Sequence, residues 1–179
     1  MENKRLKKLG LPLRLALVII IYGALFKVMH WPYAQQLMLI GSILVALLYC
    51  IRFLLKINKV QLDYVKLALV LFWFLSYSNT AFHLIDLPYV LDIIVFVLFC
   101  WWFIKEGLSY FSKRQFKGNN VLKFFYYGIL VISILLIIIG ILFKIQRWPF
   151  GNIMFTFGVI SSSLILILDY FMIKQKTSK

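Results

Sequence analysis

Long apolar runs separated by short polar connections dominate the chain. The stretch 131–143, for example, contains a single polar side chain. A bilayer core about 30 Å thick requires roughly 20 apolar residues for each helix that crosses it, and the chain supplies several runs of about that length. The pattern predicts six membrane-spanning helices, at residues 13–29, 36–55, 65–84, 90–108, 121–143 and 152–173.

The composition agrees with this pattern and leaves little room for a soluble domain. The 179 residues are 63% hydrophobic, with a mean hydropathy of +0.92. No hydrophilic segment exceeds about 20 residues, well below the ~50 that a small soluble domain needs. We therefore expect an all-α polytopic membrane protein in which residues 1–179 form a single membrane domain.

The connection after the first predicted helix has a counterpart near the end of the chain. Residues 23–33 read GALFKVMHWPY and residues 140–150 read GILFKIQRWPF. A glycine follows each tryptophan at the same distance, Gly41 in one copy and Gly158 in the other. The aromatic, lysine, tryptophan and proline residues common to both turns are Phe26, Lys27, Trp31, Pro32, Phe143, Lys144, Trp148 and Pro149. The recurrence indicates a repeated membrane hairpin.

A third, more divergent copy lies between these two. Residues 79–89, NTAFHLIDLPY, align with 23–33 without gaps and keep Phe82, Pro88 and the final tyrosine. Each copy has two spans, so all three cross the membrane in the same sense. Such copies are parallel repeats related by an axis along the membrane normal. We expect three hairpin repeats, at about 12–56, 63–108 and 121–174.

The net charge of +14 would suggest nucleic acid in a soluble protein, but here the basic residues lie in short connections between apolar runs. Of the 20 lysines and arginines, 17 fall on the side of the termini and 3 on the side of the Trp-Pro turns. Basic residues near helix ends stay cytoplasmic. We therefore expect cytoplasmic termini, external Trp-Pro turns and no nucleic-acid partner.

The turn motif has two interpretations. A tryptophan at this depth belongs to the aromatic belt of a membrane interface, the lysine can extend to the headgroups, and the proline ends a helix without losing an amide hydrogen bond. This favours a structural role for the motif over direct ligand binding.

Polar residues gather around the middle turn, and they are the candidate functional site. Asn79, His83, Asp86 and Asp92 could form an outward-facing site for a cation, a proton or a metal. Alternatively, the turn is simply hydrated. Two carboxylates and one histidine without a ligand spacing give little support for a bound metal, so the sequence predicts neither a metal nor another cofactor.

The string Gly-x-Leu-Phe-Lys-x-x-His-Trp-Pro, followed by a glycine ten residues after the tryptophan, resembles the membrane domain of the GldL family of gliding-motility and type IX secretion proteins. The resemblance covers residues 22–52 and 139–167. It implies a hairpin with a cytoplasmic amino terminus in a bacterial inner membrane. It also implies a homo-oligomer that surrounds the helices of a partner, GldM, as a proton-driven motor.

One feature that the resemblance implies is missing. The family carries a membrane-embedded glutamate four residues after the matched glycine, where it is the expected proton carrier. The corresponding positions here are Val45, Trp101 and Ser162, none of which can titrate in the bilayer. A stator requires an ionisable group within the membrane, so we do not expect this chain to be the motor itself.

Three functions remain open, and none of them is enzymatic. Within the sequence there is no nucleophile elbow, phosphate loop, dinucleotide fingerprint, HExxH or CxxC motif. The sequence favours a structural or interaction component of a cell-envelope assembly, in contact with the bilayer and with other membrane proteins or further copies of itself. A small transporter or channel, and a membrane anchor or sensor for a cytoplasmic regulator, are the alternatives.

Overall fold

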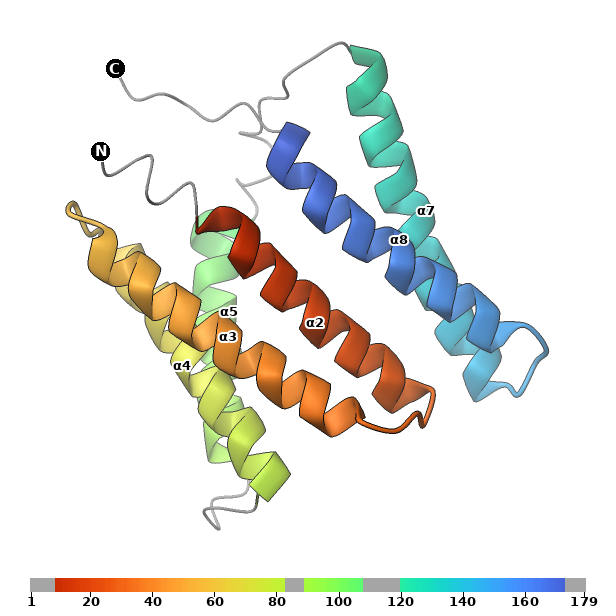
Figure 1. The fold of residues 1–179 in the computed structure, drawn as a ribbon, viewed down its shortest axis with the longest axis horizontal. Helices are drawn as coiled ribbons and strands as arrows, with labels where there is room; N and C mark the ends of the chain where they lie inside the picture. Colours follow the sequence, from red (N-terminus) through yellow and green to blue (C-terminus); the bar gives the residue numbers. More distant parts are fainter. Residues whose placement is uncertain (1–8, 83–88, 108–119, 173–179) are drawn as a thin grey trace. The chain divides into compact units, whose positions relative to one another are not determined.

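The computed structural model describes residues 9–82, 89–107 and 120–172, and every regular element within these ranges is helical. The helices are α2 (Gly10–Val28), α3 (Ala34–Leu55), α4 (Gln61–Phe82), α5 (Val90–Trp102), η1 (Phe103–Gly107), α7 (Asn120–Ile145) and α8 (Gly151–Met172) (Figure 1). The expected all-α fold is confirmed, and the predicted helix limits agree with these bounds to within about one helical turn.

Five of the described helices, α2, α3, α4, α7 and α8, are long and apolar enough to cross a membrane. The remaining span, the fourth along the chain, differs from the prediction of one continuous helix over 90–108. The α-helical part, α5, has 13 residues and continues into the π-helix η1. Gly107 permits this wide turn, because a Cβ there would lie 2.7 Å from Cδ2 of Phe103. Short π segments of this kind often occur at functional positions.

The first and third hairpins pack in the same way. In the first, a Cβ on Gly41 would meet Ile20 and the carbonyl of Ala16. In the third, a Cβ on Gly158 would meet Ile137 and the carbonyl of Ser133. The glycine and its two contacts in the first hairpin align, in the sequence repeat that pairs position 158 with position 41, with the glycine and its two contacts in the third hairpin. Because glycine has no side chain, the two helices of each hairpin approach closely at this point.

The described residues divide into two compact units, one formed by 9–20 with 35–82 and 89–107, and the other by 21–34 with 120–172. In the second unit, the buried side chains of Leu25, Phe155 and Val159 form a core cluster. Gly140 lies against α8 so closely that a Cβ would be 2.5 Å from the backbone nitrogen of Phe155. The C-terminal half of α2 therefore shares a core with α7 and α8.

In the first unit, the connection between α3 and α4 is held by one carboxylate. Asp63 accepts hydrogen bonds from the backbone N–H of Val60, at 2.9 Å, and from the ammonium of Lys56, at 2.5 Å. An acidic side chain in the first turn that accepts the N-cap amide satisfies a group that helix formation leaves unpaired. On the same side of this unit, Glu106 pairs with Lys66 and accepts a 3.1 Å bond from the Trp102 indole.

Candidate functional site

The turn between α2 and α3 is a Schellman motif in which the tryptophan is the final residue. The backbone N–H of Trp31 bonds the carbonyl of Phe26 at 2.9 Å, and that of His30 bonds the carbonyl of Lys27 at 3.2 Å. His30 has a φ of 57°, the left-handed conformation that this cap requires. The rings of Phe26 and Trp31 meet edge to face with centroids 5.0 Å apart. These contacts explain why phenylalanine and tryptophan occur at this spacing. Pro32 follows because proline cannot continue the helix and is common just after such a cap.

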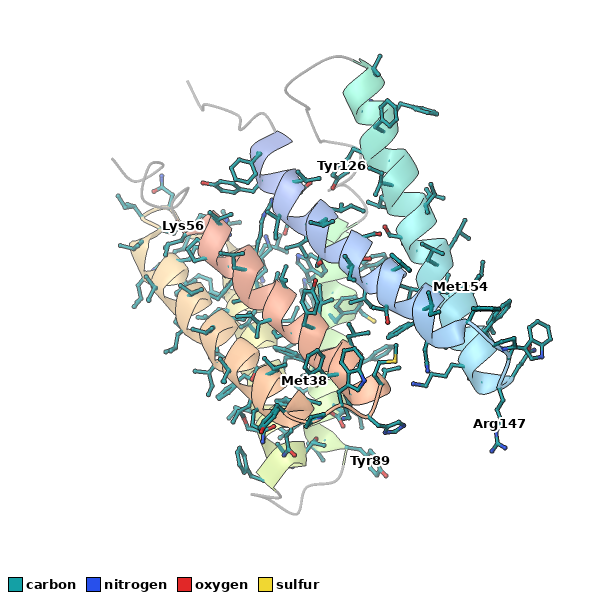
Figure 2. The ribbon with its side chains drawn as sticks, turned by 45° about the vertical axis from the view of Figure 1, so that its right-hand side comes forward. Met38, Lys56, Tyr89, Tyr126, Arg147 and Met154 are labelled. Carbon is teal, nitrogen blue, oxygen red and sulfur yellow. The ribbon has the colours of Figure 1, made fainter. Side chains whose placement is uncertain are left out.

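The turn between α7 and α8 repeats this geometry. Trp148 bonds the carbonyl of Phe143 at 2.8 Å, Arg147 bonds that of Lys144 at 3.2 Å, and Arg147 has a φ of 56°. The two aromatic rings are again 5.0 Å apart, and Pro149 follows. Figure 2 shows Arg147 extending away from the turn. Both turns therefore cap a helix, which is a structural task.

The divergent turn can be compared at one position. Tyr89 has a φ of 66°, against 65° for Tyr33 and 68° for Phe150, the residues aligned with it in the other copies. Each of the three immediately precedes a helix. Of the remaining predicted turn residues, Phe82 ends α4, and Pro88 lies outside the described residues. The backbone at Tyr89 supports the assignment of 79–89 as a third copy.

The two motif lysines have different environments. The ammonium of Lys144 donates a hydrogen bond to the carbonyl of Val28, in the last turn of α2, so the third hairpin caps the first helix of the first hairpin. A cation near a helix C-terminus also complements the helix dipole. The equivalent Lys27 is exposed and makes no hydrogen bond or ion pair with any described residue.

The predicted polar site is only partly within the described residues. His83 and Asp86 lie outside them. Asp92, in the first turn of α5, accepts a hydrogen bond from the hydroxyl of Ser76 on α4. Asn79, one turn further along α4, has a polar partner of its own and is therefore not a free amide. The structure thus brings Asp92 to Ser76, which was not among the four predicted residues.

The α4–α5 hairpin contains a second buried hydroxyl. Ser78 is 7% exposed, and its Oγ has no hydrogen-bond partner among the described residues. A buried hydroxyl without a partner costs free energy, so Ser78 is a polar position that packing alone does not explain. Among the described residues, no three His, Cys, Asp or Glu side chains lie close enough together to hold a metal ion.

A carboxylate near the other end of α8 is buried, which the sequence did not predict, since it favoured an Asp169 that pairs with Lys174 or reaches the membrane interface. Asp169 is 5% exposed and accepts a 2.8 Å hydrogen bond from the hydroxyl of Tyr126 on α7, which is also 5% exposed (Tyr126 is labelled in Figure 2). Both residues are almost equally distant from Trp148 along the chain, and residues at equal distances from a hairpin turn lie side by side. That spacing is the signal that could have identified the pair.

The three positions aligned with the family's expected proton carrier contain no carboxylate. Val45 is buried at 5% exposure, and Trp101 is half exposed. The hydroxyl of Ser162 donates to the carbonyl of Gly158, one turn earlier in α8. A serine that bonds its own helix in this way is a packing residue and adds no free polar group to the interior.

These observations define a polytopic helical membrane protein that is built from repeated hairpins with Schellman turns. The family model described as the GldL N-terminal domain matches residues 15–69 and 132–178, which together are more than half of the chain. The chain belongs to the GldL N-terminal domain family. The turn of the middle hairpin lies outside both matched segments. A search of curated proteins and a search of solved structures gave no match.

Proposed function

We propose that this chain is a non-enzymatic structural or interaction component of a cell-envelope assembly of the gliding or secretion type, and that it is not itself the proton-driven motor. Membership of the GldL N-terminal domain family supports the setting. The observation that supports the non-motor role is the absence of a carboxylate at Val45, Trp101 and Ser162. The proposed location is the bacterial inner membrane, with both termini cytoplasmic, as the distribution of basic residues favours.

Association and ion transport can be tested separately. For association, a tagged chain is purified from membranes in mild detergent, and co-purifying proteins are identified by mass spectrometry. We expect envelope membrane proteins of a secretion or motility complex. A matched control is the Gly140→Ala variant, which should disturb the core of the α7–α8 hairpin. Recovery of only a soluble regulator would instead support the anchor or sensor alternative.

For transport, the purified chain is reconstituted into liposomes that contain a pH-sensitive dye, and a proton gradient is imposed. The proposal expects a dye response no faster than that of protein-free liposomes. Proton flux that depends on Asp92 or Asp169, tested with Asp92→Asn and Asp169→Asn, would overturn the non-motor role without affecting the association result. A reporter fused at Lys179 tests orientation, and external activity of that reporter would overturn the topology.

One observation favours a second candidate, a small transporter. Within the described part of the α4–α5 hairpin, Ser76 bonds Asp92 and the buried hydroxyl of Ser78 has no partner. Polar groups inside a membrane protein frequently mark a solute or ion pathway. The same liposomes, loaded in turn with Na⁺ and K⁺ indicators, test this candidate. Cation flux that is lost in Asp92→Asn and retained in Asp169→Asn would support it.

A further inference from the structure

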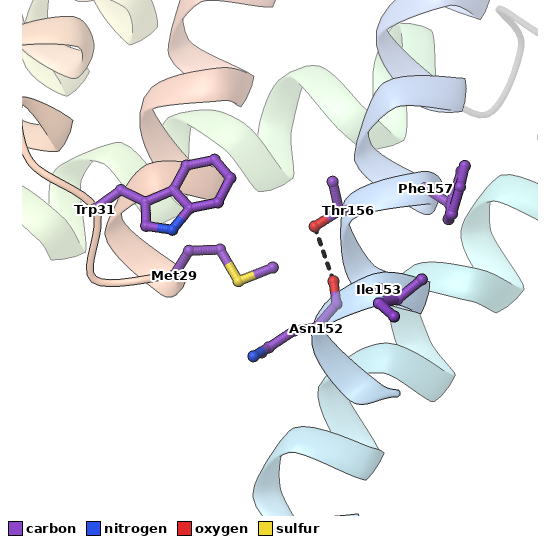
Figure 3. A pocket seen from close by; sticks show the side chains of 6 residues that line it. All are labelled: Met29, Trp31, Asn152, Ile153, Thr156 and Phe157. Carbon is purple, nitrogen blue, oxygen red and sulfur yellow. Dashed lines mark hydrogen bonds between the residues drawn. The ribbon is translucent and has the colours of Figure 1, made fainter. Parts of the chain in front are cut away.

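The second unit contains a groove between the end of α2 and the beginning of α8. It is lined by Met29, Trp31, Asn152, Ile153, Thr156 and Phe157 and has a volume of about 370 Å³ (Figure 3). Met29 extends towards α8, and the hydroxyl of Thr156 is already bonded to the carbonyl of Asn152 at 2.8 Å. The walls are therefore mainly apolar, and the amide of Asn152 and the indole N–H of Trp31 are the polar side-chain groups besides that hydroxyl.

The groove lies at the depth of a membrane interface. Trp31 forms one wall and belongs to the Schellman turn, whose tryptophan is characteristic of the aromatic belt. Ile153 and Phe157, on the opposite wall, are both more than half exposed. A groove with open apolar walls at this depth faces the lipid where acyl chains meet headgroups.

The charges around the groove have one sign. The two turns that border it contain Lys27, Lys144 and Arg147, which are the three basic residues on the Trp-Pro side of the chain. The ammonium of Lys144 reaches the carbonyl of Val28, next to Met29 in the wall. Neither 21–34 nor 144–157, the segments that form the groove and its turns, contains an acidic residue. The positive end of the α8 dipole adds to the same field.

From the groove and this charge pattern, we propose that the groove binds an anionic phospholipid of the surrounding leaflet. One acyl chain lies between Trp31 and Phe157, and the headgroup phosphate is held by Lys27 and Arg147, with the Asn152 amide donating to it. Each basic residue near a lipid surface contributes about 1 kcal/mol to the attraction of an anionic headgroup. With two such residues, we expect phosphatidylglycerol to bind about thirtyfold more tightly than phosphatidylcholine. The site is independent of the function proposed above.

The test uses the full chain in detergent with a phosphatidylglycerol that carries a photoreactive diazirine in one acyl chain. Cross-linked peptides are mapped by mass spectrometry. We expect adducts on Met29, Ile153 or Phe157. Unlabelled phosphatidylglycerol should compete for them about thirtyfold better than phosphatidylcholine. Equal competition by the two lipids, or effective competition by inorganic phosphate alone, would overturn the proposal.

Two kinds of variant localise the effect. The double variant Lys27→Gln, Arg147→Gln should weaken labelling of the groove about thirtyfold. The control Lys105→Gln, Lys123→Gln removes two exposed charges that lie outside the segments 21–34 and 144–157, and it should not weaken labelling. Thr156→Phe should block the groove, and Leu39→Phe places the same side chain at the aligned position of the first hairpin. Helix content measured by circular dichroism verifies that each variant folds. Groove labelling that persists in both the charge variant and Thr156→Phe would contradict the assignment.

Discussion

The α7–α8 and α4–α5 hairpins come from the same repeat but are stabilised by different means. α7 and α8 approach through Gly140 and Gly158 and enclose a carboxylate, Asp169, bonded to a buried tyrosine. The α4–α5 pair has a less extensive interface, α5 contributes no buried residue, and the polar contact made by Asp92 lies at an exposed position. The glycine positions have become Asn79 and Val97 in this copy. Loss of the close glycine contacts therefore accompanies a more open and more polar hairpin.

The largest effect should come from filling the close contact in α7–α8. In Gly140→Ala, the new Cβ would meet backbone atoms of Phe155 that cannot move independently of α8. We expect the free energy of unfolding to fall by about 3 kcal/mol, measured by thermal unfolding in mild detergent. Gly128→Ala is the matched control on the same helix, since nothing lies within 4 Å of its Cβ. It should be neutral or stabilise by roughly 0.5–1 kcal/mol, and an equal loss in both variants would remove the packing argument.

Removing one hydrogen bond from each hairpin should distinguish them next. Tyr126→Phe leaves the buried Asp169 without this donor, and we expect a loss of about 1–3 kcal/mol. Ser76→Ala removes the corresponding donor to Asp92, which is exposed and can bond water, so that loss should stay below about 1 kcal/mol. Thermal unfolding of both variants measures the difference. If Ser76→Ala proved as destabilising as Tyr126→Phe, the α4–α5 interface would be as dry as that of α7–α8.

Converting the turn tryptophans to the leucine that the middle copy has at position 87 should have a smaller effect. Trp31→Leu and Trp148→Leu each remove an edge-to-face ring pair, and we expect each to lower stability by about 1 kcal/mol. Trp101→Leu, on the exposed face of α5, serves as the control and should change stability by less than about 0.5 kcal/mol. A control loss as large as that in the turns would show that lipid contact, not the ring pair, is being measured.

The last effect, similar in size to that of the tryptophans, should be a gain. His30 and Arg147 occupy left-handed positions that glycine adopts without strain, so His30→Gly and Arg147→Gly should each stabilise the fold by about 1 kcal/mol. Tyr89→Gly tests the divergent turn in the same way. Lys27→Gly, within α2, should instead destabilise by about 1 kcal/mol. If only Tyr89→Gly failed to raise the unfolding temperature, the middle turn would have a different source of stability.

Most of the fold could be predicted from the chain, because apolar runs of membrane length determine each helix locally. The repeat of Phe26, Trp31 and Pro32 likewise identifies a turn, since the bonds of a Schellman motif span only six residues. The Tyr126–Asp169 pair, for which the only signal is equal spacing from the turn, and the bond from Lys144 to Val28 are not determined locally. Both join residues more than 40 positions apart, so they depend on how helices pack. The π-helical end of the fourth span, 90–108, was not predicted because it depends on the contact of Phe103 with Gly107.

The cap from Lys144 to Val28 joins two hairpins that belong to one polypeptide. Covalent linkage replaces a concentration-dependent encounter between separate subunits with an intramolecular one, so this contact forms at a fixed ratio however little protein is made. Linkage also removes a constraint. In a symmetric oligomer every copy has the same residue at a given position, whereas this chain has Arg52 in its first hairpin where the third has Asp169. Each hairpin can therefore evolve a separate task while the other two keep the structure intact.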